Sequence, residues 1–184
     1  MRQRSSIIQK KLFKEKYLAI MICLALWLFC SNSLAHLLEN QKGTINFTQN
    51  GAFLAVSIPV SGLSNIQLSD NGGLSIEEFN AKLDLIKKEV LGGITLQGQD
   101  KKTVVLRGLI LNLVHIDHKI SIPALQLMVL GRFIVRDKPE SHSLKISLFG
   151  ENPNENKITI TATANKKSQI LEFTEQKFRH LLFS

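Results

Sequence analysis

Histidine is the residue type in this chain best suited to hold a transition-metal ion, and one histidine has a special position. If the chain is cleaved after Ala35, His36 becomes the first residue. Its α-amine and its imidazole Nδ1 would then chelate one ion, an arrangement that suits Cu(II). Further ligands would come from His115, Asp117 and His118, with His142 and His180 as outside candidates. The alternative is that His36 is a frayed chain end and that the other histidines lie on loops.

A second candidate for metal chemistry lies at residues 67–78, which resemble the second half of an EF-hand calcium loop. With Gly72 at the glycine position of the loop, the oxygen ligands fall at Gln67, Ser69, Asn71, Ser75 and Glu78. Only Glu78 is anionic among them, so we expect calcium binding to be weak or absent. The same residues also form an Asn-Gly-Gly turn followed by a capping box, in which Ser75 and Glu78 begin a helix. We favour this second, structural interpretation of the EF-hand-like loop.

Side chains that would support catalysis are scarce in the chain. The sequence has no G-x-S-x-G, no H-E-x-x-H and no phosphate-binding P-loop motif. Both cysteines and the only Trp and Tyr lie in residues 1–35, so residues 36–184 contain no thiol for a nucleophile, a disulfide or a zinc site. Glu77 and Glu78 are adjacent on the expected helix and point about 100° apart, so they do not form a facing acid pair. We therefore expect a protein that is not an enzyme.

The positive charge of the chain is concentrated at its N-terminus. Of the formal net charge of +8, residues 1–35 contribute +5 and residues 36–184 only +3. A nucleic-acid-binding protein would carry its basic residues in the folded part. The charge distribution therefore argues against a nucleic-acid partner.

The N-terminal 35 residues have the order of an export signal. Six basic residues are followed by the uncharged stretch 17–30 and by the small-residue site Ser33-Leu34-Ala35. The alternative is a membrane anchor, which needs about 20 apolar residues, more than the uncharged stretch 17–30 provides. We predict a signal peptide at 1–35 and a single domain at 36–184 without a further membrane span, located in the periplasm or secreted.

The rest of the chain alternates like strands, with one interruption. The expected strands cover 44–49, 52–60, 94–97, 103–116, 125–135, 144–149, 157–164 and 169–174, and Gly108 is a candidate break in the long strand 103–116. Asn50-Gly51 indicates a hairpin between the first two strands. Apolar residues at spacings of three and four, from Ile76 to Val90, predict an amphipathic helix over about 75–91 that ends at Gly92-Gly93. Residues 177–183 are apolar enough to pack back on the domain. The pattern predicts a mainly β protein, an antiparallel β-sandwich with one inserted helix.

Several short motifs occur in an order that suggests a family. They are Ala35-His36-Leu37-Leu38, Gly43-Thr44-Ile45-Asn46, Ser57-Ile58-Pro59-Val60, Gly131-Arg132-Phe133 and Ser147-Leu148-Phe149-Gly150, with the EF-hand-like loop and its helix after the third. Over residues 35–150 the chain resembles a family of uncharacterised bacterial exported proteins with an embedded EF-hand-like loop. Over residues 35–110 it is similar, more distantly, to the extracytoplasmic N-terminal region of hydrogenase and urease accessory nickel transporters. The chain lacks the leading aspartates of the loop and any transporter helices, so the resemblance implies neither transport nor strong calcium binding.

These observations lead to one hypothesis about function and two alternatives. The first is an exported, non-catalytic binding or scaffolding protein whose partner is a periplasmic protein or another ligand of unknown identity. The first alternative is a periplasmic protein that binds a divalent metal, copper or nickel, through His36. The second alternative is a weak calcium-binding module built on the loop at 67–78.

Overall fold

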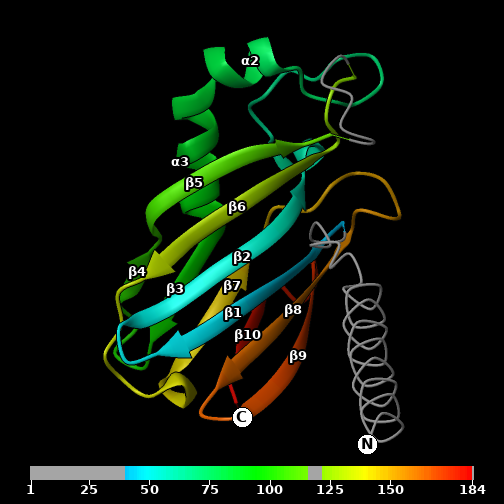
Figure 1. Ribbon diagram of the computed structural model, residues 1–184. Helices are drawn as coiled ribbons and strands as arrows, with labels where there is room; N and C mark the ends of the chain where they lie inside the picture. The colour runs from blue at the N-terminus through cyan, green and yellow to red at the C-terminus, as the bar shows by residue number, and fades with distance from the viewer. Residues whose placement is uncertain (1–39, 116–121, 184) are drawn as a thin grey trace, which may run out of the picture. The chain divides into compact units, whose positions relative to one another are not determined.

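The computed structural model describes residues 40–115 and 122–183, which belong to the compact unit Leu37–Ser184 (Figure 1). These residues form strands and two short helices, with brief 3₁₀ turns at Val60–Gly62 and Pro139–Ser141. The strands are β1 (Lys42–Thr48), β2 (Gly51–Pro59), β3 (Ile94–Gly98), β4 (Thr103–Val105), β5 (Arg107–Val114), β6 (Gln126–Phe133), β7 (His142–Ile146), β8 (Lys157–Ala164), β9 (Lys167–Thr174) and β10 (Arg179–Leu181). The helices are α2 (Ile76–Ala81) and α3 (Leu83–Gly93). The predicted mainly β fold class is confirmed.

The strands form two sheets. The larger has the order β5-β6-β2-β1-β8-β9 and the smaller has the order β10-β7-β3-β4 (Figure 1). All pairs are antiparallel except β1 and β8, which run parallel. The larger sheet is therefore mixed, a departure from the purely antiparallel sandwich that the sequence predicts.

The chain passes from one sheet to the other at both edges. The edge strands β4 and β5 are separated only by Leu106, which is buried, and the edge strands β9 and β10 are joined by a tight turn at Thr174–Lys177. The 103–116 segment was predicted as a long strand with a candidate break at Gly108, and the structure divides it two residues earlier, at Leu106. Gly108, with φ of +61°, lies in a β-bulge between Arg107 and Ile110 in the pairing of β5 with β6. A left-handed φ is accessible to glycine without steric cost, which is why the strand bends here.

The core lies between the sheets, and β1 and β8 contribute to it by strict alternation. On β1, Ile45 and Phe47 point inward while their neighbours are exposed, and β8 buries every second residue from Ile158 to Ala164. The C-terminal residues also contribute, because Leu182 is fully buried and Phe183 packs on the core. The expectation that the chain end packs back on the domain is confirmed.

The inserted helix begins as predicted but is not continuous. Ser75 caps α2, and the predicted capping box is confirmed, since both reciprocal hydrogen bonds between Ser75 and Glu78 are present at 3.2 Å. Lys82 leaves the helical conformation, with φ of −112° and ψ of 15°, and divides the predicted 75–91 helix into α2 and α3. Ile86 and Val90 of α3 enter the core, whereas α2 has no buried residue. None of the helices in the described residues is long and apolar enough to cross a membrane.

The β1–β2 turn differs from the prediction by one residue. Thr48 pairs with Gly51, so the two-residue loop is Gln49-Asn50 rather than Asn50-Gly51. Gly51 has φ of +123° and already belongs to β2. The prediction identified the glycine that the turn requires but placed it inside the loop instead of at its end.

Candidate functional site

The outer face of the six-stranded sheet has two chemically different halves. On β1, β8 and β9 the outward residues are mainly polar, including Thr44, Thr159, Thr161 and Thr163. Thr163 also donates a hydrogen bond of 3.0 Å to Asn46 Oδ1 across the parallel strand pair. This half shows the ordinary alternation of strands in a sheet that has one solvated face.

The other half, on β2, β6 and β5, carries apolar side chains outward. Phe53 on β2 is 44% exposed and Ile110 on β5 is 54% exposed, with Leu130 of β6 half-buried between the same strands. They line a groove of about 450 Å³ that reaches from β1 to the bulge at Gly108. We call this feature the sheet groove and define it by Phe53, Ala55, Arg107, Ile110, Leu130 and Arg132.

The register of the strands explains why the sheet is hollow here. Thr44, Ala55, Leu130 and Ile110 form one row across β1, β2, β6 and β5. Ala55 is the smallest member of this row, and larger side chains stand on both sides of it. The missing side-chain volume at Ala55 leaves the depression between Phe53 and Ile110, whose floor is the core residue Leu54.

The neighbouring row carries the charge of the groove. Asn46, Phe53, Arg132 and Arg107 face one another in this order across the same four strands. The Arg132 guanidinium lies over the Phe53 ring, 5.8 Å from its centroid, in a cation–π contact. Within residues 40–115 and 122–183, no carboxylate lies within ion-pair distance of Arg107 or Arg132.

Two arginines facing each other are unfavourable in a sheet. Opposite residues in an antiparallel pair have Cα atoms about 4.5–5.5 Å apart, and like charges there repel. The fork of an arginine matches the two oxygens of a carboxylate or the oxygens of a phosphate. The sheet groove therefore places apolar side chains next to two arginines that face each other. Its described lining contains no carboxylate, imidazole or thiol that could act as a general base.

The EF-hand-like loop is organised differently, because its polar atoms bind one another. The Ser69 hydroxyl lies 2.6 Å from Asn71 Oδ1 and 2.7 Å from the Gly73 carbonyl, and Gly73 N–H donates to Asn71 Oδ1 at 3.1 Å. Ser75 and Glu78 are engaged in the capping box, and Gln67 is exposed. Four of the five candidate calcium ligands thus have partners within the loop itself. The structure assigns them to turn formation and helix capping.

The loop is also tied to the rest of the domain through its backbone. Leu74 forms an antiparallel bridge with Ala124, with both N–H···O distances at 2.9 Å, and its side chain is fully buried. Gly72 has φ of +73°, which supplies the reversal before this bridge. The loop is therefore an integral part of the fold.

The described histidines are not brought together into a metal site. His36, Asp117 and His118 lie outside the described residues, so metal binding through His36 stays a prediction. The other three each have a backbone partner: His115 Nδ1 lies 3.1 Å from Ile122 O, His142 Nδ1 lies 3.1 Å from Lys138 O, and His180 Nε2 lies 2.6 Å from Glu172 O. Among residues 40–115 and 122–183, no three His, Cys, Asp or Glu side chains are grouped to hold a metal ion.

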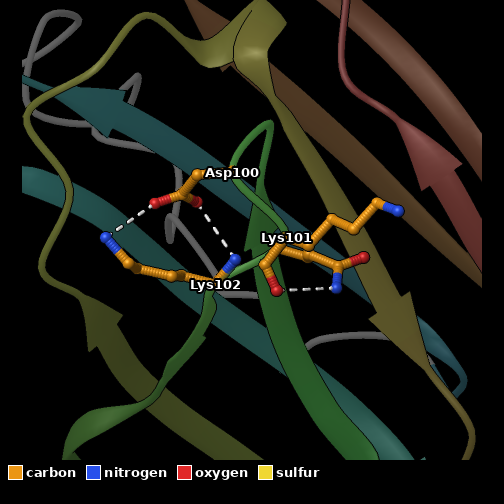
Figure 2. Close-up of polar contacts among 4 residues, drawn as sticks. Asp100, Lys101 and Lys102 are labelled. Atoms are coloured by element: carbon orange, nitrogen blue, oxygen red, sulfur yellow. Dashed lines mark hydrogen bonds and ion pairs between the residues drawn. The ribbon is translucent and has the colours of Figure 1, made fainter.

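A second surface depression, of about 650 Å³, lies between the β3–β4 turn and the chain after β6 and carries charges of both signs, including Asp100, Arg136 and Glu140. Figure 2 shows that the Asp100 carboxylate is occupied within its own turn: one oxygen accepts from Lys102 N–H at 3.0 Å and the other lies 3.1 Å from Lys102 Nζ. The hydrogen bond from the Lys102 backbone, followed by that from its side chain, lowers the pKa of Asp100 below the usual value. These contacts stabilise the turn.

The sequence patterns did not point to the sheet groove. One signal was present, since Phe53 falls on an outward position of a strand whose inward positions are all apolar. The opposition of Arg107 and Arg132 depends on the register of β5 against β6, which neither segment reveals alone. No protein-family model matches the chain, and no curated protein matches it significantly.

Proposed function

We propose that this is an exported, non-catalytic binding protein, periplasmic or secreted, and that the sheet groove is its ligand-binding surface. The observation that carries the proposal is the exposure of Phe53 and Ile110 around a groove on one half of a sheet face whose other half is mainly polar. Export is supported by the signal-like residues 1–35.

The energetic argument starts from the alternation of the strands. Folding requires apolar residues only on the inner positions of these strands, and the polar half shows that the outer positions tolerate threonine. Apolar residues at Phe53 and Ile110 therefore contribute little to the stability of the isolated domain. Exposed apolar side chains that gather around a depression are typical of binding sites.

The proposal can be tested with a neutral apolar dye, because such a dye reports the groove without using charge. Nile red fluorescence is measured with the purified protein and with Ile110→Ser. Ile170→Ser is the matched control, since Ile170 is 69% exposed on the same face but lies on β9 outside the groove. We expect Ile110→Ser to reduce dye binding severalfold and Ile170→Ser to leave it unchanged.

Equal loss of dye binding in the two variants would contradict the proposal, because it would show adsorption to any exposed apolar side chain. The same conclusion would follow if neither variant changed the signal. Circular dichroism and the unfolding midpoint are measured to check that both variants fold. We expect them to fold, because substitutions at exposed positions change stability by about 0.5 kcal/mol or less.

A further inference from the structure

We infer that the sheet groove binds a single-chain amphiphile with an anionic headgroup, its alkyl chain over Ala55 between Phe53 and Ile110 and its headgroup between Arg132 and Arg107. This inference rests on the proposed function and specifies the chemistry of the ligand. It uses three observations. Arg107 and Arg132 face each other without an acidic partner among the described residues, the Arg132 guanidinium lies over the Phe53 ring, and the groove has the size of a small-molecule site.

The first observation is the pair of facing arginines, because no contact between described residues explains why two like charges lie opposite each other. Arg107 and Arg132 are opposite each other in register, and neither has an acidic partner in the described part of the chain. Elsewhere in the same sheet an exposed cation is matched, as Lys157 on β8 pairs with Glu172 on β9 at 3.2 Å. An anion placed between the two guanidinium groups would turn their repulsion into two charge-assisted contacts.

The orientation of Arg132 fits such a contact. Arg132 is directly opposite Phe53 on the neighbouring strand, and its guanidinium lies over the Phe53 ring. The aromatic side chain that lines the groove therefore also positions the charge. Arginine that stacks on a ring retains its edge N–H groups for an oxygen acceptor. On the other side, the bulge between Arg107 and Ile110 places a cation and an apolar side chain from one strand against the same groove.

The size and lining of the groove favour a small amphiphile over a macromolecule. A volume of about 450 Å³ lies in the range of small-molecule sites, and Leu130, Ala55 and Ile110 provide the apolar contact in a continuous row. A nucleic acid would need a longer basic track with several aromatic residues for stacking. An acidic peptide could reach the same arginines, and it is therefore tested as a competing ligand.

The experiment compares two ligands of equal chain length, decanoate and 1-decanol, both used below their aggregation limits. Each is titrated against Nile red bound to the purified protein at low salt. We expect both to displace the dye and decanoate to bind more tightly. Arg132→Gln and, separately, Arg107→Gln should weaken decanoate about fivefold each and leave 1-decanol unchanged. Arg136→Gln is the matched control, because Arg136 is an exposed arginine that lines the other depression. It should change neither ligand.

The outcomes separate this inference from the proposed function. If the two ligands bind equally, and both are lost in Ile110→Ser, the groove binds apolar molecules and the anionic headgroup is wrong. If neither ligand displaces the dye, while a decapeptide of glutamates does so in an arginine-dependent manner, the ligand is an acidic peptide and the inference is overturned. A decanoate affinity that is insensitive to salt would also contradict it, since contacts between exposed charges are screened. If Ile110→Ser and Ile170→Ser behave alike, the proposed function itself fails.

Discussion

The sheet groove and the EF-hand-like loop are both exposed to solvent, and they differ in whether their polar groups have partners within the protein. In the loop, Ser69 and Asn71 bond each other, and Ser75 bonds Glu78. In the groove, Arg107 faces Arg132 without a described counter-ion. The polar groups of the loop therefore already have partners, whereas the two arginines of the groove would obtain a partner from an anionic ligand.

This difference decides which region is the better candidate for binding. A cation that entered the loop would have to break the internal hydrogen bonds of Ser69, Asn71 and the capping box before it was coordinated, and only Glu78 would offer a full negative charge. An anion that entered the groove would break no described hydrogen bond of Arg107 or Arg132. Local hydrogen bonding thus accounts for the loop residues, and it does not account for the two arginines.

The first prediction establishes that both regions rest on the same core. Leu54 lies beneath the groove and Leu74 anchors the loop, and both are buried. We expect Leu54→Ala and Leu74→Ala each to lower the free energy of unfolding by about 2–5 kcal/mol, because each removes buried methyl groups and leaves a cavity. Urea denaturation measures both. A cost below about 1 kcal/mol for Leu74→Ala would show that the loop is only loosely attached and would weaken the comparison.

The elements that the sequence predicted well are those fixed by local patterns. The β8 strand was predicted at 157–164 and occurs there, because every second residue from Ile158 is apolar. The capping box was predicted from Ser75 and Glu78, which lie in one turn of helix. By contrast, the parallel pairing of β1 with β8 joins segments more than a hundred residues apart, and no local signal encodes it.

The same distinction explains what the sequence revealed about the site. The EF-hand-like loop was found because its residues are contiguous, and the structure then shows them bonded to one another. The groove depends on three nonlocal facts: the register of β6 between β2 and β5, the small Ala55 between larger neighbours, and the bulge near Gly108. The break at Lys82 was also missed, because helical spacing of apolar residues continues across it.

The second prediction tests whether the loop needs an ion for its structure. Ser75→Ala removes the hydroxyl that accepts from Glu78 N–H, and we expect it to lower the free energy of unfolding by about 1 kcal/mol. The loss should be the same in calcium and in chelator, because the hydroxyl caps α2 rather than binding an ion. Thermal unfolding under both conditions measures it. Ser168→Ala, at an exposed serine of β9, is the control and should change stability by about 0.5 kcal/mol or less.

A calcium-dependent difference between the native protein and Ser75→Ala would contradict this interpretation. It would mean that Ser75 contributes an oxygen ligand in solution and that the loop, like the groove, is completed by a ligand. The contrast between the two regions would then be lost.

The last prediction has the smallest effect and concerns the exposed carboxylate of Asp100, whose partners, like those of the loop residues, lie within its own turn. In the β3–β4 turn, one Asp100 oxygen accepts a hydrogen bond from the Lys102 backbone N–H, and the other lies next to the Lys102 ammonium group (Figure 2). Because the pKa of Asp100 is lowered in the folded protein, its charged form stabilises the fold. That contribution is fully present above the unfolded pKa of about 3.9 and is lost as the pH falls through the lower folded value. Asp100→Asn should therefore reduce stability slightly at pH 7 and have a smaller effect at pH 2.5. Urea midpoints at the two pH values measure the change, and a loss at pH 2.5 as large as that at pH 7 would show that the carboxylate charge does not hold the turn.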